Sequence, residues 1–397
     1  KGRHKGEKLL DGRVVSAITA FLFHAGSHDD PARLIENADK AFEGAVVVGT
    51  GFTFDDSDST GIASTVSEMH RLIDGAALNS EVVFPYIGGD EVNSSPTHAS
   101  HRYVINFGER GEEECREKWP ELIAIVEERV RSEREGSLAR SQSADKKRRA
   151  RYWWRFARNA TELNSAIAGR ERVLVCPGGS AATKYLSFAF LRVGYVFSQT
   201  LCVFALSSNQ DFCVLQSRVH EAWGRFFGAT LGDGLRYSSS DVFETFPRPN
   251  DSKRNRHLDS AGKEYYEFRA DLMVRNDEGL TKTYNRFHDP NERNPEILKL
   301  RDLHAEMDRA VLAAYGWSDV PTDCEFFLDY EIDEEEWGEK KKPWRYRWPD
   351  DVRDEVLARL LALNQERADA EARSGVSSSR RRSRSMGAPL LEESLFE

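Results

Sequence analysis

The stretches FPYIGGDEVNSSP (residues 84–96) and LRYSSSDVFETFPRP (residues 235–249) enclose the part of the chain that decides its fold. Between them, short apolar or alternating runs predict strands, which lie at 101–107, 171–176, 185–191 and 194–206. Residues 211–227 instead carry apolar side chains at helical spacing and predict one amphipathic helix with Asp211 as its N-cap. This mixture of strands and helices predicts an α+β domain over residues 61–250.

A strongly basic run, RSQSADKKRRARYWWRFAR, occupies residues 140–158 and carries eight Lys or Arg side chains against one Asp. Basic side chains release counterions from nucleic acid and flat rings can stack on bases, so this composition is typical of a surface that follows phosphates. The alternative is a solvated helix whose Trp153 and Phe156 pack inward, and both can hold at once. The side chains of this run that we expect to contact nucleic acid are Arg148, Arg149, Arg151, Trp154 and Arg155.

Two loops offer further small polar or basic side chains. Asn93 and Ser94 follow the Gly88–Gly89 pair and could cap a helix or reach phosphate oxygens. The run PGGSAATK (residues 177–184) ends in Lys184 and could either enter a groove or form a plain hairpin turn. The sequence alone leaves these alternatives open.

The regions on either side differ from this central part. Residues 1–60 contain apolar runs at 17–25 and 44–54 that predict the last strands of an α/β sheet. Residues 251–371 predict a mainly helical region, with helices at 264–276, 295–316 and 352–370. Residues 372–397 are polar and basic and predict a disordered tail.

Composition limits the class of protein. The chain has 397 residues and a net charge of -10, so any contact with nucleic acid must come from local basic patches. Its five cysteines form no CxxC pair, which predicts free thiols in a reducing cytoplasm and no structural zinc. We find no membrane-spanning run and expect no membrane partner.

No segment supplies a complete active site. The Gly49-Thr50-Gly51 turn lacks a following helix and is followed by Asp55-Asp56, which would repel a phosphate group. Asp329 with residues 339–341 loosely fits a metal-nuclease pattern, but without the strand scaffold that would place two carboxylates on one metal. We therefore expect no catalytic residue, cofactor site or metal site in this chain.

Taken together, the motifs resemble the C-terminal half of MmeI-like type IIG restriction-modification enzymes and related adenine-specific DNA methyltransferases. The resemblance covers roughly residues 17–370 and is carried, in order, by FPYIGGDEVNSSP, RYVINF, RARYWWRFA, ERVLVC, YVFSQTLCVFAL, LQSRVHEAWGRFFGATLGDGLRYSSSDVFETFPRP, GLTKTYNRFHDP and AVLAAYGW.

The resemblance implies a fold in three parts: the α/β remnant of a methyltransferase sheet, an α+β target-recognition domain and a mainly α C-terminal domain. It also implies an upstream methyltransferase domain that uses S-adenosylmethionine to methylate adenine N6, in some members with a nuclease domain further upstream. The NPP-aromatic motif and the S-adenosylmethionine loop are missing here, so we expect the chain to be incomplete at its N-terminus.

In the family, the segment that matches LGDGLRYS, together with the loop before it, faces double-stranded DNA. Carried over, this makes Asp233, Arg236, Tyr237 and Ser238 candidate DNA contacts, in which an arginine can read guanine and an aspartate can accept from cytosine. The glycines at 232 and 234 depart from the larger side chains that relatives often have there. Alternatively, Arg236 forms an ion pair with Asp233 or Asp241.

The sequence therefore predicts the DNA-recognition portion of a methyltransferase or type IIG enzyme. The alternative is a stand-alone specificity or interaction subunit that docks onto a separate catalytic chain.

Overall fold

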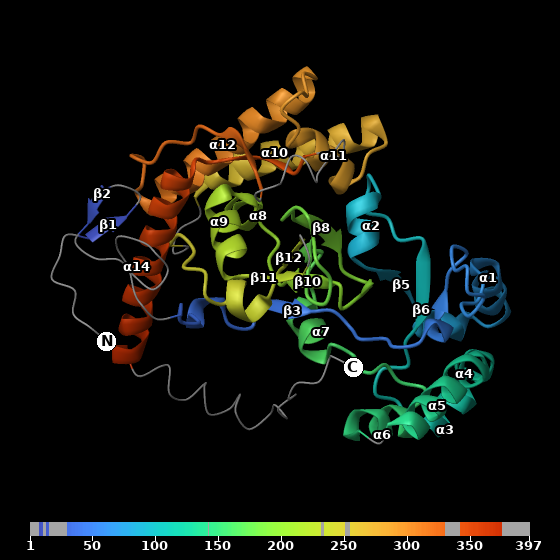
Figure 1. Cartoon of the computed structure of the whole chain (residues 1–397). Helices are drawn as coiled ribbons and strands as arrows, with labels where there is room; N and C mark the ends of the chain where they lie inside the picture. The colour runs from blue at the N-terminus through green and yellow to red at the C-terminus, as the bar shows by residue number, and fades with distance from the viewer. Residues whose placement is uncertain are drawn as a thin grey trace.

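The computed structural model describes residues 8–10, 13–15, 30–141, 143–231, 234–250, 255–329 and 342–374 (Figure 1). The strand expected at 17–25, Asp233 and the tail beyond residue 374 lie outside these residues. Three parts are visible in Figure 1: a central sheet with helices around it, a layer of helices above it, and a smaller helical lobe at lower right.

The central sheet is antiparallel, in the order β3 (Ala41–Glu43), β10 (Leu201–Phe204), β7 (Arg172–Pro177) and β8 (Ala189–Arg192). Every residue of β10 is buried, as its unbroken apolar run requires, because helices cover the sheet. The expected strand at 185–191 is shorter than predicted and begins only at Ala189.

A second four-stranded sheet runs in the order β4 (Thr53–Phe54), β6 (Arg102–Ile105), β5 (Val83–Ile87) and β9 (Val196–Phe197). Beside it lie α1 (Val66–Gly75) and the small lobe, which is built from α3 (Glu112–Lys118), α4 (Pro120–Val126), α5 (Ser132–Arg140) and α6 (Ala144–Arg151). These elements share a core separate from that of the central sheet.

The glycine turn expected within residues 44–54 is present, but the expectation that this run ends a separate sheet is wrong. Val48 and Gly49 have φ angles of 48° and 124°, which interrupt the extended chain, and a 3-10 turn follows at Thr50–Phe52. On either side of this break, β3 pairs with β10 and β4 pairs with β6. Residues 41–54 therefore join the two sheets of the predicted recognition domain.

The predicted helix at 211–227 is in fact two helices, α8 (Asn209–Gln216) and α9 (Arg218–Phe227). Ser217 stands between them in an extended conformation, and its hydroxyl accepts a hydrogen bond from the His220 N–H, which caps a new helix. Ser208, not Asp211, caps α8, while Asp211 completes a capping box with it.

The C-terminal region is mainly helical, as predicted. It contains α10 (Arg256–Asn276), α11 (Leu280–Phe287), α12 (Pro295–Tyr315) and α14 (Asp350–Ser374), with a hairpin of β13 (Glu325–Leu328) and β14 (Trp344–Arg347). Helices α10 and α14 pack on α8 and α9, respectively, so this region shares one continuous core with the central sheet.

Candidate nucleic-acid interface

The two loops predicted to face DNA are brought together, although about fifty residues separate them in the sequence. The 177–184 loop lies against the hairpin of β11 (Ala229–Leu231) and β12 (Gly234–Arg236). The N–H groups of Thr183 and Leu235 each donate to the other residue's carbonyl at 2.9 Å, and the Gly179 N–H donates to the Tyr237 carbonyl at 3.0 Å. We call residues 177–184, 229–231 and 234–238 the composite tip.

Two glycines make this close approach possible. Gly179 has a φ of +63°, and a Cβ there would lie 2.5 Å from the Gln199 carbonyl oxygen. At Gly178 a Cβ would lie 2.9 Å from the Cβ of Tyr237. Any side chain at Gly179 would strain the backbone and push the loop away from its neighbours.

Arg236 and Lys184 are exposed cations of the composite tip, and Arg236 is the one on the β11–β12 hairpin. Its Nε donates to the Gly179 carbonyl at 2.7 Å, which fixes the guanidinium at the edge of the loop. Within the described part of the chain no carboxylate pairs with it, and Asp241 is engaged by Arg33 and by the hydroxyls of Ser238 and Ser240. Of the alternative ion pairs, the one with Asp241 is therefore absent, and the one with Asp233 lies outside the described residues.

The expectation of direct DNA contact by Tyr237 is corrected, because its side chain is fully buried. Its hydroxyl lies 3.1 Å from His220 Nε2, and His220 Nδ1 lies 2.8 Å from the Leu215 carbonyl. Since a carbonyl can only accept, Nδ1 carries the proton and Nε2 accepts from Tyr237. Burial lowers the pKa of His220 to about 4, so its ring is neutral. Through its hydrogen bond with Tyr237, the ring stabilises the composite tip from the interior of the protein.

Ser238 is half-buried and acts locally. Its hydroxyl accepts from the Asp241 N–H at 3.2 Å and donates to the Asp241 carboxylate at 3.0 Å. These bonds cap the turn that follows β12, and they leave this hydroxyl little capacity for a second partner.

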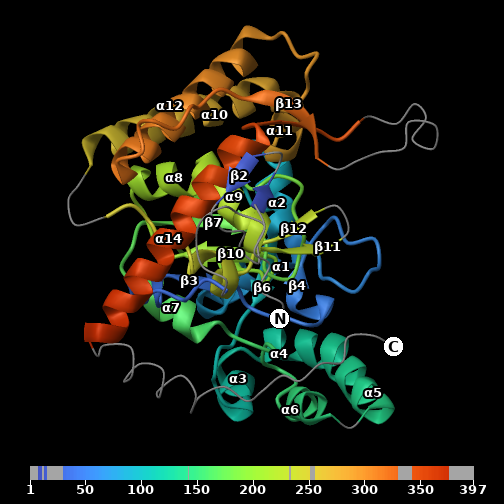
Figure 2. The ribbon, with the colours of Figure 1, turned by 60° about the vertical axis from the view of Figure 1, so that its left-hand side comes forward.

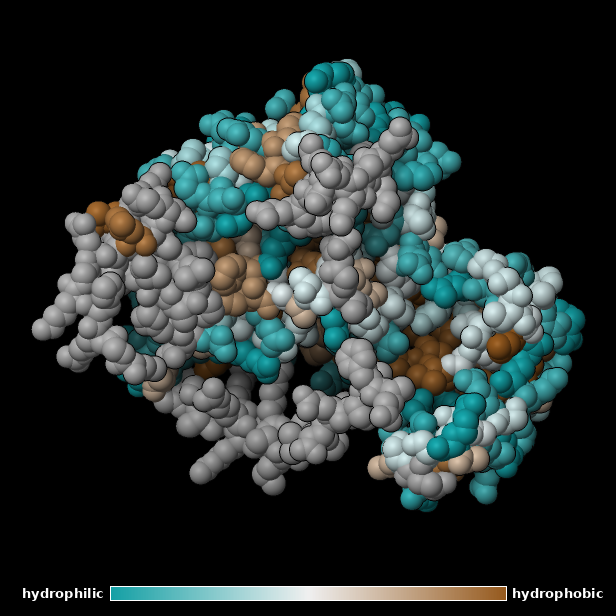
Figure 3. Space-filling view, in the orientation of Figure 1, coloured by the Kyte–Doolittle hydropathy of each residue, from teal (hydrophilic) through white to brown (hydrophobic). Residues whose placement is uncertain are grey.

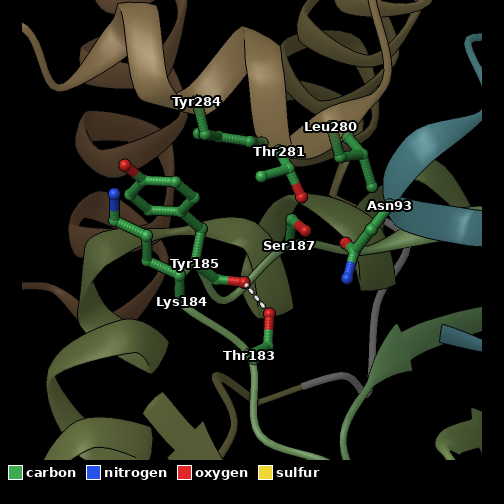
Figure 4. A pocket seen from close by; sticks show the side chains of 8 residues that line it. All are labelled: Asn93, Thr183, Lys184, Tyr185, Ser187, Leu280, Thr281 and Tyr284. Carbon is green, nitrogen blue, oxygen red and sulfur yellow. Dashed lines mark hydrogen bonds between the residues drawn. The ribbon is translucent and has the colours of Figure 1, made fainter. Parts of the chain in front are cut away.

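Lys184 and Asn93 meet at a small pocket of about 30 Å³ (Figure 4). Asn93 lies on α2 (Gly89–Ser94), and its side chain faces the pocket from the side opposite Lys184. Lys184 Nζ donates to the Asn285 side-chain oxygen at 3.0 Å. The remaining lining residues are Thr183, Tyr185, Ser187, Leu280, Thr281 and Tyr284. Ser94 is exposed and its hydroxyl donates to the Asp90 carbonyl at 2.6 Å.

The basic run forms α6, which begins after a Ser143 cap and has no buried residue. Arg148 and Arg149 pair with Asp145 at 3.0 and 2.8 Å, and such pairs near the surface have small energetic value. Arg148 is exposed and also donates to the Ala157 carbonyl at 2.6 Å, whereas Arg149 is half-buried. Arg151 is exposed and lies over the Tyr152 ring. The helix therefore presents a positive surface from Lys146, Lys147, Arg148, Arg149 and Arg151.

The two remaining candidates of the basic run have structural roles. Trp154 is only 6% exposed, and its indole N–H donates to the Arg110 carbonyl at 3.0 Å. Arg155 donates to the same carbonyl and pairs with Glu109 at 2.9 Å. The expected base contact by Trp154 is thus corrected, because this ring fills the core of the lobe and has almost no surface to offer a base.

The composite tip and α6 lie on different parts of the molecule. Figures 1 and 2 both place α6 in the lower lobe, well away from β11 and β12. In the space-filling view, the described surface of this lobe is mostly hydrophilic or neutral (Figure 3). The structure therefore offers two candidate contact surfaces and not one.

No local sequence pattern marks Asn285, the partner of Lys184, although its segment GLTKTYNRFHDP is among the motifs that carry the resemblance. Asp329, the residue considered for a nuclease site, pairs with Arg345. In the described ranges no group of three or more His, Cys, Asp or Glu side chains could hold a metal ion. A search of the same residues finds no helix with the length and apolarity needed to cross a membrane.

Comparisons with known proteins show which structure and which family this chain is similar to. No curated protein matches the chain. Among solved structures, the type IIL restriction-modification enzyme MmeI in complex with DNA is similar over 90% of this chain, with a TM-score of 0.56 and 18% identity. This chain covers 39% of that enzyme's chain. The family model of the MmeI target recognition domain matches residues 29–250, which include both sheets, α6 and the composite tip. The chain therefore belongs to the MmeI target recognition domain family.

Proposed function

We propose that this chain recognises a short sequence in double-stranded DNA through its composite tip, with α6 contacting the phosphate backbone. The observation that carries the proposal is the position of Arg236. It is an exposed guanidinium, anchored by one backbone carbonyl and free of carboxylate partners among the described residues. A guanidinium held in this way keeps its terminal N–H groups for the bidentate contact that reads guanine.

The second surface supports the proposal because it suits a different task. Helix α6 carries five basic side chains against Asp145 in a chain of net charge -10. Such a patch attracts phosphate without reading sequence. The similarity in fold to MmeI, which is described as a restriction-modification enzyme in complex with DNA, supports a role in DNA recognition.

The proposal extends to the larger enzyme that the resemblance implies. There, an upstream domain would bind S-adenosylmethionine and methylate adenine N6, and in restriction members a nuclease domain would lie further upstream. In such an enzyme this chain would select the site, and the upstream domain would flip out and modify the base.

Selection from a pool of random-sequence duplexes tests the proposal. The 397-residue chain should enrich duplexes that share one short motif, and should bind them more tightly than a scrambled duplex of the same composition. A folded chain that enriches no motif, or that binds both duplexes equally, would contradict it. Binding must be compared at one fixed salt concentration, since the phosphate contribution changes steeply with salt.

A further inference from the structure

The C-terminal helical region reaches into the composite tip at the backbone of Lys184. The Lys184 carbonyl accepts two hydrogen bonds, both at 3.1 Å, from the guanidinium groups of Arg225 and Arg345. Arg225 lies on α9, and Arg345 lies on β14 of the C-terminal hairpin. Hydrogen bonds from charged donors are stronger than neutral ones, so this peptide is held firmly from two sides.

Both arginines are themselves fixed by carboxylates. Arg345 is 2% exposed and pairs with Asp329, and Arg225 pairs with Glu221 at 2.8 Å. Planar guanidinium groups paired in this way have little freedom to turn. The Lys184 carbonyl is therefore bound to a rigid support that includes β14, more than 150 residues further along the chain.

Tyr185 makes a second connection to the same region. Its ring stacks on His288, with the ring centroids 4.8 Å apart, and its hydroxyl donates to the Asn285 side-chain oxygen at 2.8 Å. Lys184 Nζ donates to that same oxygen at 3.0 Å. Burial lowers the pKa of His288 well below its ordinary value, which keeps this ring neutral in the stack.

Thr183 connects these contacts to the rest of the composite tip by hydrogen bonds. Its hydroxyl donates to the Tyr185 carbonyl at 2.8 Å, as the dashed line in Figure 4 shows. Its backbone exchanges two hydrogen bonds with Leu235, the neighbour of Arg236. A continuous series of contacts thus joins α11 and β14 to the residue proposed to read a base.

We infer that Asn285 and Arg345 are positioning residues for sequence recognition, which set the geometry of the composite tip without touching DNA themselves. This inference rests on the proposed function. Base reading depends on the placement of a few donors, whereas phosphate binding by α6 tolerates small displacements. Loosening this support should therefore change sequence preference and leave non-specific binding unchanged.

The test uses Asn285→Ala, Arg345→Lys and Tyr185→Phe in the 397-residue chain. Controls are Asn291→Ala and Arg353→Lys, at exposed or half-exposed sites outside this series of contacts. For each variant we would measure binding to a selected duplex and to a scrambled duplex, the salt dependence of both, and the urea midpoint. All three substitutions should lower the ratio of the two affinities, Asn285→Ala and Arg345→Lys by about tenfold, with the salt dependence and non-specific affinity unchanged. The controls should match the wild type.

Hydrogen exchange gives a readout that does not depend on DNA. The amides of residues 178–184 should exchange faster in Asn285→Ala than in Asn291→Ala, because the loop opens locally more often. If Arg345→Lys lowers the urea midpoint, the variant is destabilised, and the inference is then tested by Asn285→Ala and Tyr185→Phe. Unchanged preference and unchanged exchange in these variants would overturn the inference while sequence recognition by the wild type stands. A wild-type chain without sequence preference would instead overturn the proposed function.

Discussion

The composite tip and α6 are built in opposite ways. In the tip, segments from different parts of the sequence are joined by backbone hydrogen bonds, with Gly178 and Gly179 closely packed and a buried His220–Tyr237 pair beneath. In α6, the basic side chains lie close together in sequence on a helix without buried residues, and two of them pair weakly with Asp145. One surface fixes the direction of a few polar groups, and the other supplies charge.

This difference matches two kinds of contact with DNA. Reading a base requires hydrogen-bond donors held at fixed angles, which a rigid support provides. Binding phosphate requires mainly positive charge, which mobile surface side chains provide at little cost. The comparison therefore predicts that substitutions in the two regions affect different measurements.

The largest expected effect is on the free energy of unfolding, and it comes from a substitution in the core of the small lobe. Trp154→Ala should lower the free energy of unfolding by about 3–5 kcal/mol, because a large buried ring is lost. Urea unfolding measures this, with Arg151→Ala as an exposed control from the same run. If Trp154→Ala left stability unchanged and weakened DNA binding, the ring would contact DNA after all.

The support beneath the tip should make stability depend on pH. The pKa of His220 is about 4 in the folded protein and near 6.5 when unfolded, so the unfolded chain binds the proton more readily. The free energy of unfolding is therefore not reduced by His220 above pH 6.5. As the pH falls below that value, protonation in the unfolded chain reduces it, by about 2 kcal/mol at pH 5. Urea unfolding of wild type and His220→Gln at pH 8 and pH 5 measures it. Parallel losses in the two proteins would assign the pH dependence to other groups.

The turn of the loop offers a sharper comparison at a single glycine. Gly179→Ala should cost about 1–3 kcal/mol and reduce sequence preference, because the residue needs a positive φ and has no room for a Cβ. Gly169→Ala is the matched control, since Gly169 has a φ of +76° but open space around it. Equal effects of the two substitutions on preference would show that the close packing at Gly179 is unimportant.

The smallest expected effect belongs to α6. Arg151→Ala should weaken binding to every duplex by the same factor and reduce the slope of affinity against salt by about one. Titration at several salt concentrations on the selected and scrambled duplexes measures both quantities. A change in the ratio between the two duplexes would assign Arg151 a part in base reading.

Much of this architecture follows from local pattern. The strands at 102–105 and 172–177 and the helices of the C-terminal region appear where apolar spacing predicts them. The stop at Gly316, with its left-handed φ of 78°, follows from a residue type that favours this conformation. The basic helix is also visible in sequence, because its charges lie close together.

What the sequence did not reveal depends on contacts between distant residues. Burial of Trp154 and Tyr237 arises from packing, and an aromatic ring in a basic or polar run gives no sign of which way it points. Ser217 divides the predicted helix 211–227 because its hydroxyl caps a new helix, although the apolar spacing continues through it. The roles of Asn285 and Arg345 depend on Lys184 and Tyr185, a hundred or more residues away.

The most direct test of this division of labour is to measure Arg236→Ala and Arg151→Ala side by side on a selected and a scrambled duplex. The account predicts that Arg236→Ala lowers the ratio of the two affinities by about tenfold or more, with little change on the scrambled duplex. Arg151→Ala should leave that ratio unchanged and weaken binding to both duplexes. Equal losses on both duplexes for Arg236→Ala would contradict the assignment of base reading to the composite tip.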